Sequence, residues 1–202
     1  RALPFHDPDR LVLGEAIING SPNPMVAFPD YLDYRDQSES FEVLGAMMGF
    51  TLPVTVTGTE EPERVPMSFA TGNLFEALGV QPLLGRTFSP EEFRALGASP
   101  VAVLSHGFWQ TTFGGDPGVV GRALELNDRS YEVVGVMPPG FDYPGDASVW
   151  VSAQFAVPDP PFQGDEDPSL DRGAEYVYGV GRLREESSLG EARQQGREFL
   201  ND

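Results

Sequence analysis

Glycine and proline interrupt this sequence along almost its whole length. The chain contains 23 Gly and 19 Pro among 202 residues, about a fifth of the total. Both residue types favour turns and end regular structure. This spacing predicts many short strands and helices and argues against a bundle of long helices. The apolar fraction of 40% is ordinary for a folded protein, so one large domain or two small ones can each bury a core.

The charge of the chain is strongly one-sided. Its 31 acidic residues outweigh 13 basic residues, for a net charge of −18. Such a surface repels the phosphates of nucleic acids and anionic lipids, so neither is an expected partner. Excess carboxylates of this kind commonly serve solubility.

Two residue types are absent from the chain altogether. There is no Lys, because every basic residue is Arg, and there is no Cys. The first absence excludes a phosphate-binding loop of the Walker type and a Schiff-base lysine. The second excludes thiolate catalysis, Cys-ligated zinc and disulfides, and it is typical of an exported bacterial domain.

The two ends of the sequence suggest a piece of a longer protein. The chain starts at Arg1 without Met or a signal peptide, and the helical pattern of Glu191–Leu200 continues to the end without a stop signal. No run of about 18 apolar residues occurs, so none of these residues is expected to span a membrane. We expect apolar spans of about 20 residues on both sides in the parent gene.

Alternating and helical patterns predict the order of the elements. Strands come first and last, each next to a helix, and hairpins fill the middle, which is typical of an α+β fold. The predicted strands are Leu11–Ile18, Phe50–Thr57, Arg64–Ala70, Val101–Leu104, Arg122–Leu126, Tyr131–Val136, Ser148–Val151 and Tyr176–Leu183. Predicted helices begin at Pro29, His106 and Leu189, and a short one, capped by Thr71–Asn73, runs through Leu78.

Ser105, His106 and Asp116 are the residue types of a hydrolase triad. In a triad the base must hold the nucleophile and an acid must orient the base. Adjacent residues at a helix start point in different directions, and the chain has no GxSxG elbow. The pattern therefore favours Ser105 as a helix N-cap, His106 as a helix-start residue and Asp116 as part of a turn. The other histidine, His6, lies near the N-terminus, so a His-based metal site has few candidates.

Paired carboxylates offer a second candidate chemistry, that of a glycosidase. Asp30 with Asp33, and Glu91 with Glu92, are such pairs. In so acidic a chain these pairs arise from composition alone. Asp30 and Glu91 are better interpreted as helix-start residues, where carboxylates meet free N–H groups.

An acidic stretch near the C-terminus is a candidate calcium site. It lacks the EF-hand order and the closing Glu, and Pro interrupts it. A solvated surface loop over Pro158–Leu170 is therefore favoured. The carboxylates concerned are Asp159, Asp165, Glu166, Asp167 and Asp171.

Aromatic residues cluster around the predicted helix His106–Phe113. Phe108, Trp109 and Phe113, with Tyr131, could form a ligand-binding face. The four-residue spacing of Trp109 and Phe113 is ordinary core patterning, so packing is favoured. The following Gly114–Pro117 lacks the GxGxxG order and is read as a turn.

The stretch from Ser99 to Phe141 carries a resemblance to a known family. This stretch contains, in order, the segments SPVAVLSHGFWQ, FGGDP, VGR, LN and YEVVGVMPPGF. Together they closely resemble a recurrent segment of MacB-like periplasmic core domains, in the version of the acidobacterial duplicated orphan permeases. Further segments also resemble this family: DYLDYR from Asp30, GNLF from Gly72, GRTF from Gly85, VGRL from Val180, and Leu189–Ala192.

The resemblance implies a fold and a role. In that family a porter-like α/β subdomain, built from both ends of the segment, carries an inserted small α/β-rich subdomain with β-hairpins. We expect residues 1–47 and 156–202 to form the porter-like part and residues 48–155 to form the insert. The family's domains lie on the periplasmic face of ABC-type permeases anchored by transmembrane helices. Some members work with a periplasmic adaptor protein, so the resemblance implies such an adaptor or another permease subunit as the partner of this chain.

The leading hypothesis is therefore a non-catalytic extracytoplasmic domain of an ABC-type permease that acts in efflux or export. On this hypothesis no catalytic, cofactor-binding or metal-binding residues are expected, and no cofactor. The alternatives are a periplasmic hydrolase using Ser105, His106 or an acid pair, and a stand-alone solute- or calcium-binding domain using the acidic loop.

Overall fold

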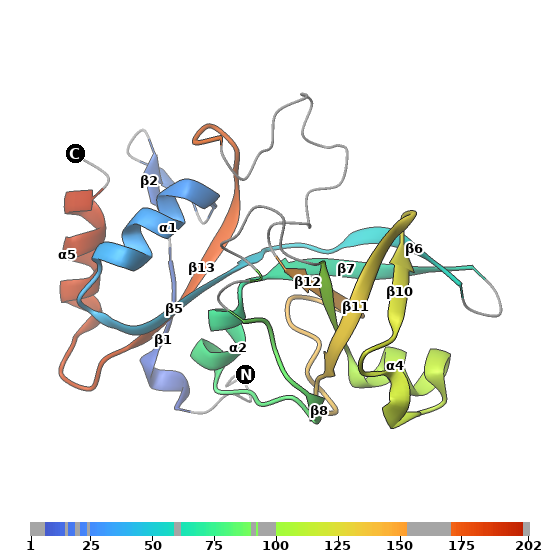
Figure 1. The fold of residues 1–202 in the computed structure, drawn as a ribbon. Helices are drawn as coiled ribbons and strands as arrows, with labels where there is room; N and C mark the ends of the chain where they lie inside the picture. The colour runs from blue at the N-terminus through green and yellow to red at the C-terminus, as the bar shows by residue number, and fades with distance from the viewer. Residues whose placement is uncertain are drawn as a thin grey trace. The chain divides into compact units, whose positions relative to one another are not determined.

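The chain divides into two compact units that exchange the polypeptide four times. Unit 1 comprises residues 1–49, 73–80 and 157–202, and unit 2 comprises residues 50–72 and 81–156. The structure is a computed structural model, drawn in Figure 1, that describes residues 7–14, 16–18, 21–23, 25–58, 62–89, 92, 100–152 and 171–199. The fold is α+β, with a mixed sheet and helices, as the sequence predicts.

Unit 1 is organised around strand β13 (Glu175–Leu183), which pairs antiparallel with three other strands. These partners are β1 (Leu11–Leu13), β4 (Val26–Ala27) and β5 (Phe41–Met48). A second, two-stranded sheet joins β2 (Ala16–Ile18) to β3 (Ser21–Asn23). The helical elements are the short 3₁₀ helix η1 (Pro8–Arg10), α1 (Phe28–Gln37), α2 (Gly72–Leu78) and α5 (Leu189–Phe199).

The prediction of one buried strand over Leu11–Ile18 is wrong. The N–H of Gly14 still donates to the carbonyl of Gly179 on β13, at 2.8 Å, but β2 pairs in the separate sheet. Leu13 is 53% exposed, so this apolar run is not uniformly buried. An apolar run by itself does not distinguish one strand from two short ones, which is why the sequence analysis missed the break.

Helices α1 and α5 of unit 1 lie side by side (Figure 1), and the hydroxyl of Tyr34 donates to the carbonyl of Ala192 at 3.1 Å. Helix α1 begins where Pro29 predicts, because proline is tolerated in the first turn. Tyr31 anchors it to β5: the ring is buried and its hydroxyl donates to the carbonyl of Leu44 at 2.9 Å.

Unit 2 contains six strands whose pairings close into a ring. The order around the ring is β6–β7–β12–β9–β11–β10, and β10 returns to β6. Each of the six strands therefore has a partner on both sides, which leaves no free edge along the ring. The strands are β6 (Leu52–Thr57), β7 (Glu63–Ala70), β9 (Val101–Leu104), β10 (Ala123–Leu126), β11 (Arg129–Val136) and β12 (Val149–Ser152). The two-residue strand β8 (Leu84–Gly85) pairs with β11 beside it.

Local signals of the sequence locate the remaining elements of unit 2. Helix α4 (His106–Phe113) ends at Gly114, whose φ of 60° is the left-handed conformation of a helix stop. Asp116 begins the 3₁₀ helix η2 (Pro117–Val119), its carboxylate accepting from the N–H of Gly118 at 2.9 Å. The β10–β11 hairpin is tighter than the predicted four-residue loop. Its turn consists of Asn127 and Asp128 alone, both at positive φ, as a type I′ turn requires.

Ser105 is the N-cap of α4: its hydroxyl accepts from the N–H of Phe108 at 3.2 Å. We expect Ser105→Ala to lower the free energy of unfolding by about 1 kcal/mol, because a buried helix-start N–H loses its acceptor. Gly107→Ala should raise the free energy of unfolding by up to about 1 kcal/mol, because alanine favours a helix more than glycine does and open space surrounds this position. Urea denaturation measures the free energy of unfolding of both variants. A decrease in both would contradict this account of the helix start.

Candidate functional site

The three residues that suggest a hydrolase each have a separate structural role. The hydroxyl of Ser105 caps α4 as an acceptor, and the ring of His106 lies edge-on to Trp109 at 5.5 Å between centroids. Asp116 begins η2 and forms an ion pair with Arg122. In the described part of the chain no hydrogen bond joins these three side chains, so the geometry does not assemble a triad.

The paired carboxylates are held by arginines. Arg172 bridges Asp30 and Asp33 on α1, with 2.7 Å between its Nη2 and an oxygen of Asp33. Glu91 lies outside the described residues. Glu92 accepts two hydrogen bonds from Arg86, at 2.7 and 2.9 Å, and one from the N–H of Ser89, at 2.7 Å. The three described carboxylates, Asp30, Asp33 and Glu92, are therefore each paired with an arginine.

The candidate calcium loop is only partly described. Asp159, Asp165, Glu166 and Asp167 lie outside the described residues. Asp171 is described, and its carboxylate accepts from the N–H of Gly173 at 2.7 Å in a local turn. Within the ranges that the structure describes, no three His, Asp or Glu side chains gather as metal ligands would.

The aromatic residues of the middle segment pack as core. Phe108, Trp109 and Tyr131 are buried, and the rings of Phe108 and Phe113 meet edge-to-face at 5.7 Å. The indole N–H of Trp109 donates to the carbonyl of Asp116 at 2.9 Å, which closes the turn after α4. Burial raises the pKa of the Tyr131 hydroxyl above its ordinary value, against the opposing charge of Arg129.

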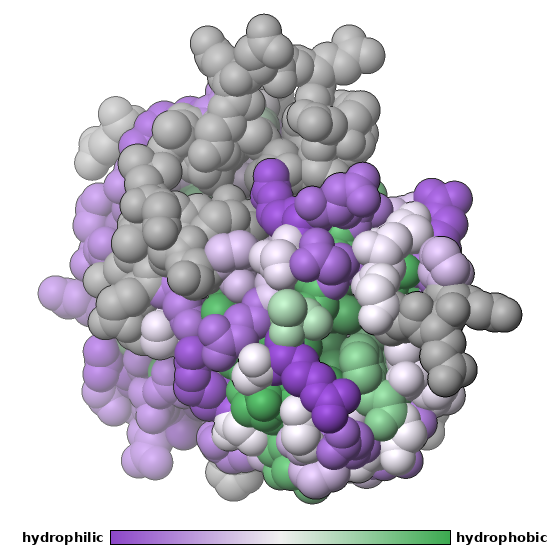
Figure 2. Space-filling model, turned by 45° about the vertical axis from the view of Figure 1, so that its right-hand side comes forward, coloured by the Kyte–Doolittle hydropathy of each residue, from purple (hydrophilic) through white to green (hydrophobic). Residues whose placement is uncertain are grey.

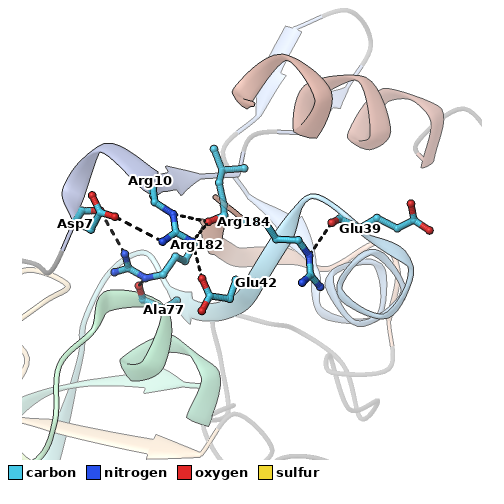
Figure 3. Close-up of polar contacts among 8 residues, drawn as sticks. Asp7, Arg10, Glu39, Glu42, Ala77, Arg182 and Arg184 are labelled. Carbon is cyan, nitrogen blue, oxygen red and sulfur yellow. Dashed lines mark hydrogen bonds and ion pairs between the residues drawn. The ribbon is translucent and has the colours of Figure 1, made fainter. Parts of the chain in front are cut away.

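Unit 1 contains a polar cluster that the sequence analysis did not identify. It consists of Arg10, Arg182 and Arg184, which donate mainly to backbone carbonyls (Figure 3). The Nε of Arg10 donates to the carbonyl of Leu183 at 2.8 Å, and its Nη2 lies 2.6 Å from a carboxylate oxygen of Glu42. Arg184 is exposed and donates to the carbonyl of Glu39 at 2.9 Å. We call these three residues the arginine cluster.

Arg182 is the buried member of the arginine cluster, with 6% of its surface exposed. Its Nε donates to the carbonyl of Ala77 at 2.9 Å, and its Nη1 donates to the carbonyl of Asp7 at 3.4 Å. Ala77 lies in the last turn of α2, where backbone carbonyls lack helical partners and favour a cation. The sequence signal for this contact is Arg182 itself, the one charged residue in the apolar run Tyr176–Leu183.

Helix α2 packs in unit 1 through apolar side chains. Leu74, Phe75, Ala77 and Leu78 are each at most 1% exposed. Gly45 on β5 allows this close packing: a Cβ atom at this position would lie 2.4 Å from the Cα and N atoms of Leu74. No side chain larger than hydrogen fits such an approach without displacing the backbone of α2.

A polar cleft of about 260 Å³ lies where α2, β5 and the end of α1 meet. It is smaller than a typical site for a drug-sized ligand, about 300 Å³ or more. Arg35 on its wall is engaged only in part: Nε and Nη2 bind the same oxygen of Asp36, at 2.8 and 2.7 Å, and the guanidinium lies over the ring of Tyr31. Its Nη1 is buried and has no hydrogen-bond partner among the described residues. The lining residues are Arg35, Ser38, Phe41, Glu42, Val43, Leu44, Asn73, Glu76 and Arg184.

The fold has counterparts among solved structures. The periplasmic region of MacB from Actinobacillus actinomycetemcomitans superposes with a TM-score of 0.67 at 12% identity, over 95% of this chain and 82% of that one. A domain assigned to a permease protein of Porphyromonas gingivalis gives 0.71 at 16% identity, over 98% and 85%. The extracellular domain of the noncanonic ABC-type transporter YknZ from Gram-positive bacteria gives 0.62 at 14% identity, over 95% and 93%.

The two interleaved units and the mixed sheet define the class of this protein as an α+β domain. The sequence profile of the MacB-like periplasmic core domain matches residues 6–198. The chain belongs to this family of ABC-type permease domains, as the segments within Ser99–Phe141 predict. No curated protein shows a significant sequence match. None of the described helices is both long and apolar enough to cross a membrane.

The pKa of Glu92 is lower than its ordinary value of 4.5. Burial by itself raises this pKa, but the hydrogen bonds from Arg86 and Ser89 outweigh that effect. Such a carboxylate stabilises the fold above its unfolded pKa, and the contribution is lost as the pH falls through the folded pKa.

We therefore expect Glu92→Gln to be less stable than the unmodified chain at pH 7, and the difference to shrink as the pH falls below about 4.5. Urea midpoints measured between pH 7 and pH 3 test this. Arg86→Met removes the donor and should reduce the same pH-dependent part. A difference that stays constant over this pH range would show that the ion pair is not its source.

Proposed function

We propose that this chain is a non-catalytic extracytoplasmic domain of a bacterial ABC-type permease subunit. It would act in efflux or export by contacting a partner and transmitting a conformational change. The observation that carries the proposal is the match of the MacB-like periplasmic core domain profile to residues 6–198.

The division of the chain supports an assignment of the two subdomains. In this proposal residues 1–47 and 156–202 are the porter-like part and residues 48–155 are the inserted part. The inserted part contains the ring of six strands and its hairpins. The two units differ from this assignment at residues 48–49 and 73–80, which belong to unit 1, and at residue 156, which belongs to unit 2.

The surface supports contact with another protein rather than with nucleic acid. The net charge of −18 opposes a phosphate backbone. On the face shown in Figure 2, hydrophobic residues (green) lie among hydrophilic ones (purple). In the described part of unit 2 the most exposed large apolar side chains are Leu83, Phe50 and Val120. We propose another permease subunit or a periplasmic adaptor protein as the partner.

The absence of Cys allows a direct test of location. Ser130 is exposed and Ser68 is fully buried, and both belong to unit 2. In the parent protein, Ser130→Cys should react with a membrane-impermeant maleimide added to intact spheroplasts, above the level of the unmodified parent. Ser68→Cys is the matched control and should react only after denaturation. Labelling of Ser130→Cys that requires cell lysis would place the domain in the cytoplasm and overturn the proposal.

A further inference from the structure

We propose that the polar cleft of unit 1 binds a small zwitterion, a molecule of amino-acid size that carries both a carboxylate and an ammonium group. The residues that line the cleft come from α1 and its end, β5, α2 and the chain just after β13, and all of them belong to unit 1. The site goes beyond the proposed function, because its occupant is a free small molecule and not the protein partner of the domain.

The volume of the cleft sets the size of the occupant. The cleft measures about 260 Å³. Since a closed cavity of about 150 Å³ holds benzene, this space admits a molecule of about six to ten non-hydrogen atoms. Its walls carry four charged side chains, which are Arg35, Glu42, Glu76 and Arg184. An apolar molecule would leave these groups without water or hydrogen bonds, so a charged molecule fits the cleft better.

One wall of the cleft contains a buried guanidinium whose hydrogen bonds are incomplete. Arg35, in the last turn of α1, has 9% of its side chain exposed. Its Nε and Nη2 share a single oxygen of Asp36, and its Nη1 has no partner among the described residues. A buried charged group without an acceptor is costly. A small turn of the guanidinium, whose Nη1 is shielded from water, would bring this N–H group to a carboxylate in the cleft.

A second guanidinium lies at the same cleft and is open to solvent. Arg184 is exposed, and its Nε donates to the carbonyl of Glu39 at 2.9 Å (Figure 3). In the described part of the chain neither of its two Nη atoms has a hydrogen-bond partner. A guanidinium binds a carboxylate through two parallel N–H groups. Arg184 and Arg35 therefore mark the side of the cleft that takes the ligand carboxylate.

The cleft also presents a negative charge, which favours a zwitterion over a simple acid. Glu42 is already paired with Arg10, at 2.6 Å. Glu76 is exposed, and its carboxylate has no hydrogen-bond or ion-pair partner among the described residues, Arg184 included. Glu76 would repel a simple acid, whereas it would attract an ammonium group on the same ligand. A zwitterion also has no net charge, so the −18 charge of the chain does not repel it.

Titration of the 202-residue chain at neutral pH tests the site with three matched probes. Alanine carries both charges, propionate lacks the ammonium group, and ethylamine lacks the carboxylate. Backbone amide signals of the cleft, at Ser38, Val43 and Asn73, report binding in NMR spectra. We expect alanine to shift these signals saturably, with a Kd at least about tenfold lower than that of propionate or ethylamine, because only alanine meets both charges.

Two variants each remove one charge from an exposed wall residue. Arg184→Gln should raise the Kd for alanine and for propionate about tenfold or more, because both probes lose a guanidinium. Glu76→Gln should raise the Kd for alanine but not that for propionate, because only alanine loses the partner of its ammonium group. Arg193→Gln and Glu186→Gln are the matched controls, since both residues are exposed, lie outside the cleft and belong to unit 1. Neither control should change either Kd.

Arg35→Lys tests the buried wall of the site. Lysine keeps the positive charge but replaces the planar fork of the guanidinium with a single nitrogen. We expect the Kd for alanine to rise about tenfold in a variant whose NMR spectrum keeps its native dispersion. If this buried substitution unfolds unit 1, the two exposed variants decide the matter alone.

Three results would overturn the site. The absence of saturable shifts with alanine would show that the cleft binds no such ligand. Propionate that binds as tightly as alanine would show that Glu76 does not select an ammonium group. Equal losses in the control variants would show that the shifts report general charge and not the cleft. Binding is measured on the chain itself and maleimide labelling on the parent protein in cells, so the site and the proposed function can fail separately.

Discussion

The burial of Arg182 in the central strand of unit 1 is the constraint on which much of this unit depends. A guanidinium with 6% of its surface exposed is costly unless its N–H groups find acceptors. The carbonyls of Ala77 and Asp7 supply them, from positions 105 and 175 residues earlier in the chain. The hydrogen bonds of this one side chain therefore hold the end of α2 and the backbone of Asp7 against β13.

Features determined by neighbouring residues could be predicted from the sequence. Pro29 places the start of α1, Ser105 caps α4 and Gly114 ends it, because each signal acts within one helical turn. The closing of six strands into a ring, and the packing of α2 in unit 1, depend on contacts between distant residues. Turn length also escaped prediction, since it depends on whether Arg129 and Ser130 pair with β10.

The candidate catalytic residues illustrate why residue type alone does not define a site. Serine, aspartate and glutamate serve as nucleophiles and acids, but the same oxygens accept hydrogen bonds at helix starts. Ser105 and Asp116 accept hydrogen bonds at helix starts. Glu92 accepts from the N–H of Ser89 and pairs with Arg86. The informative polar residue was Arg182, a lone charge within an apolar strand. Its acceptor, the carbonyl of Ala77, lies 105 residues away in the sequence, so the contact depends on the tertiary fold.

The closed ring of unit 2 opposes local bending of its strands. Each of its six strands is hydrogen-bonded on both sides, so local bending of one strand would break pairings with two neighbours. The segment before β8 is tied to the same ring, since the N–H of Leu83 donates to the carbonyl of Val136 on β11 at 2.7 Å. The strands of unit 2 should therefore open together as one cooperative unit and not one at a time.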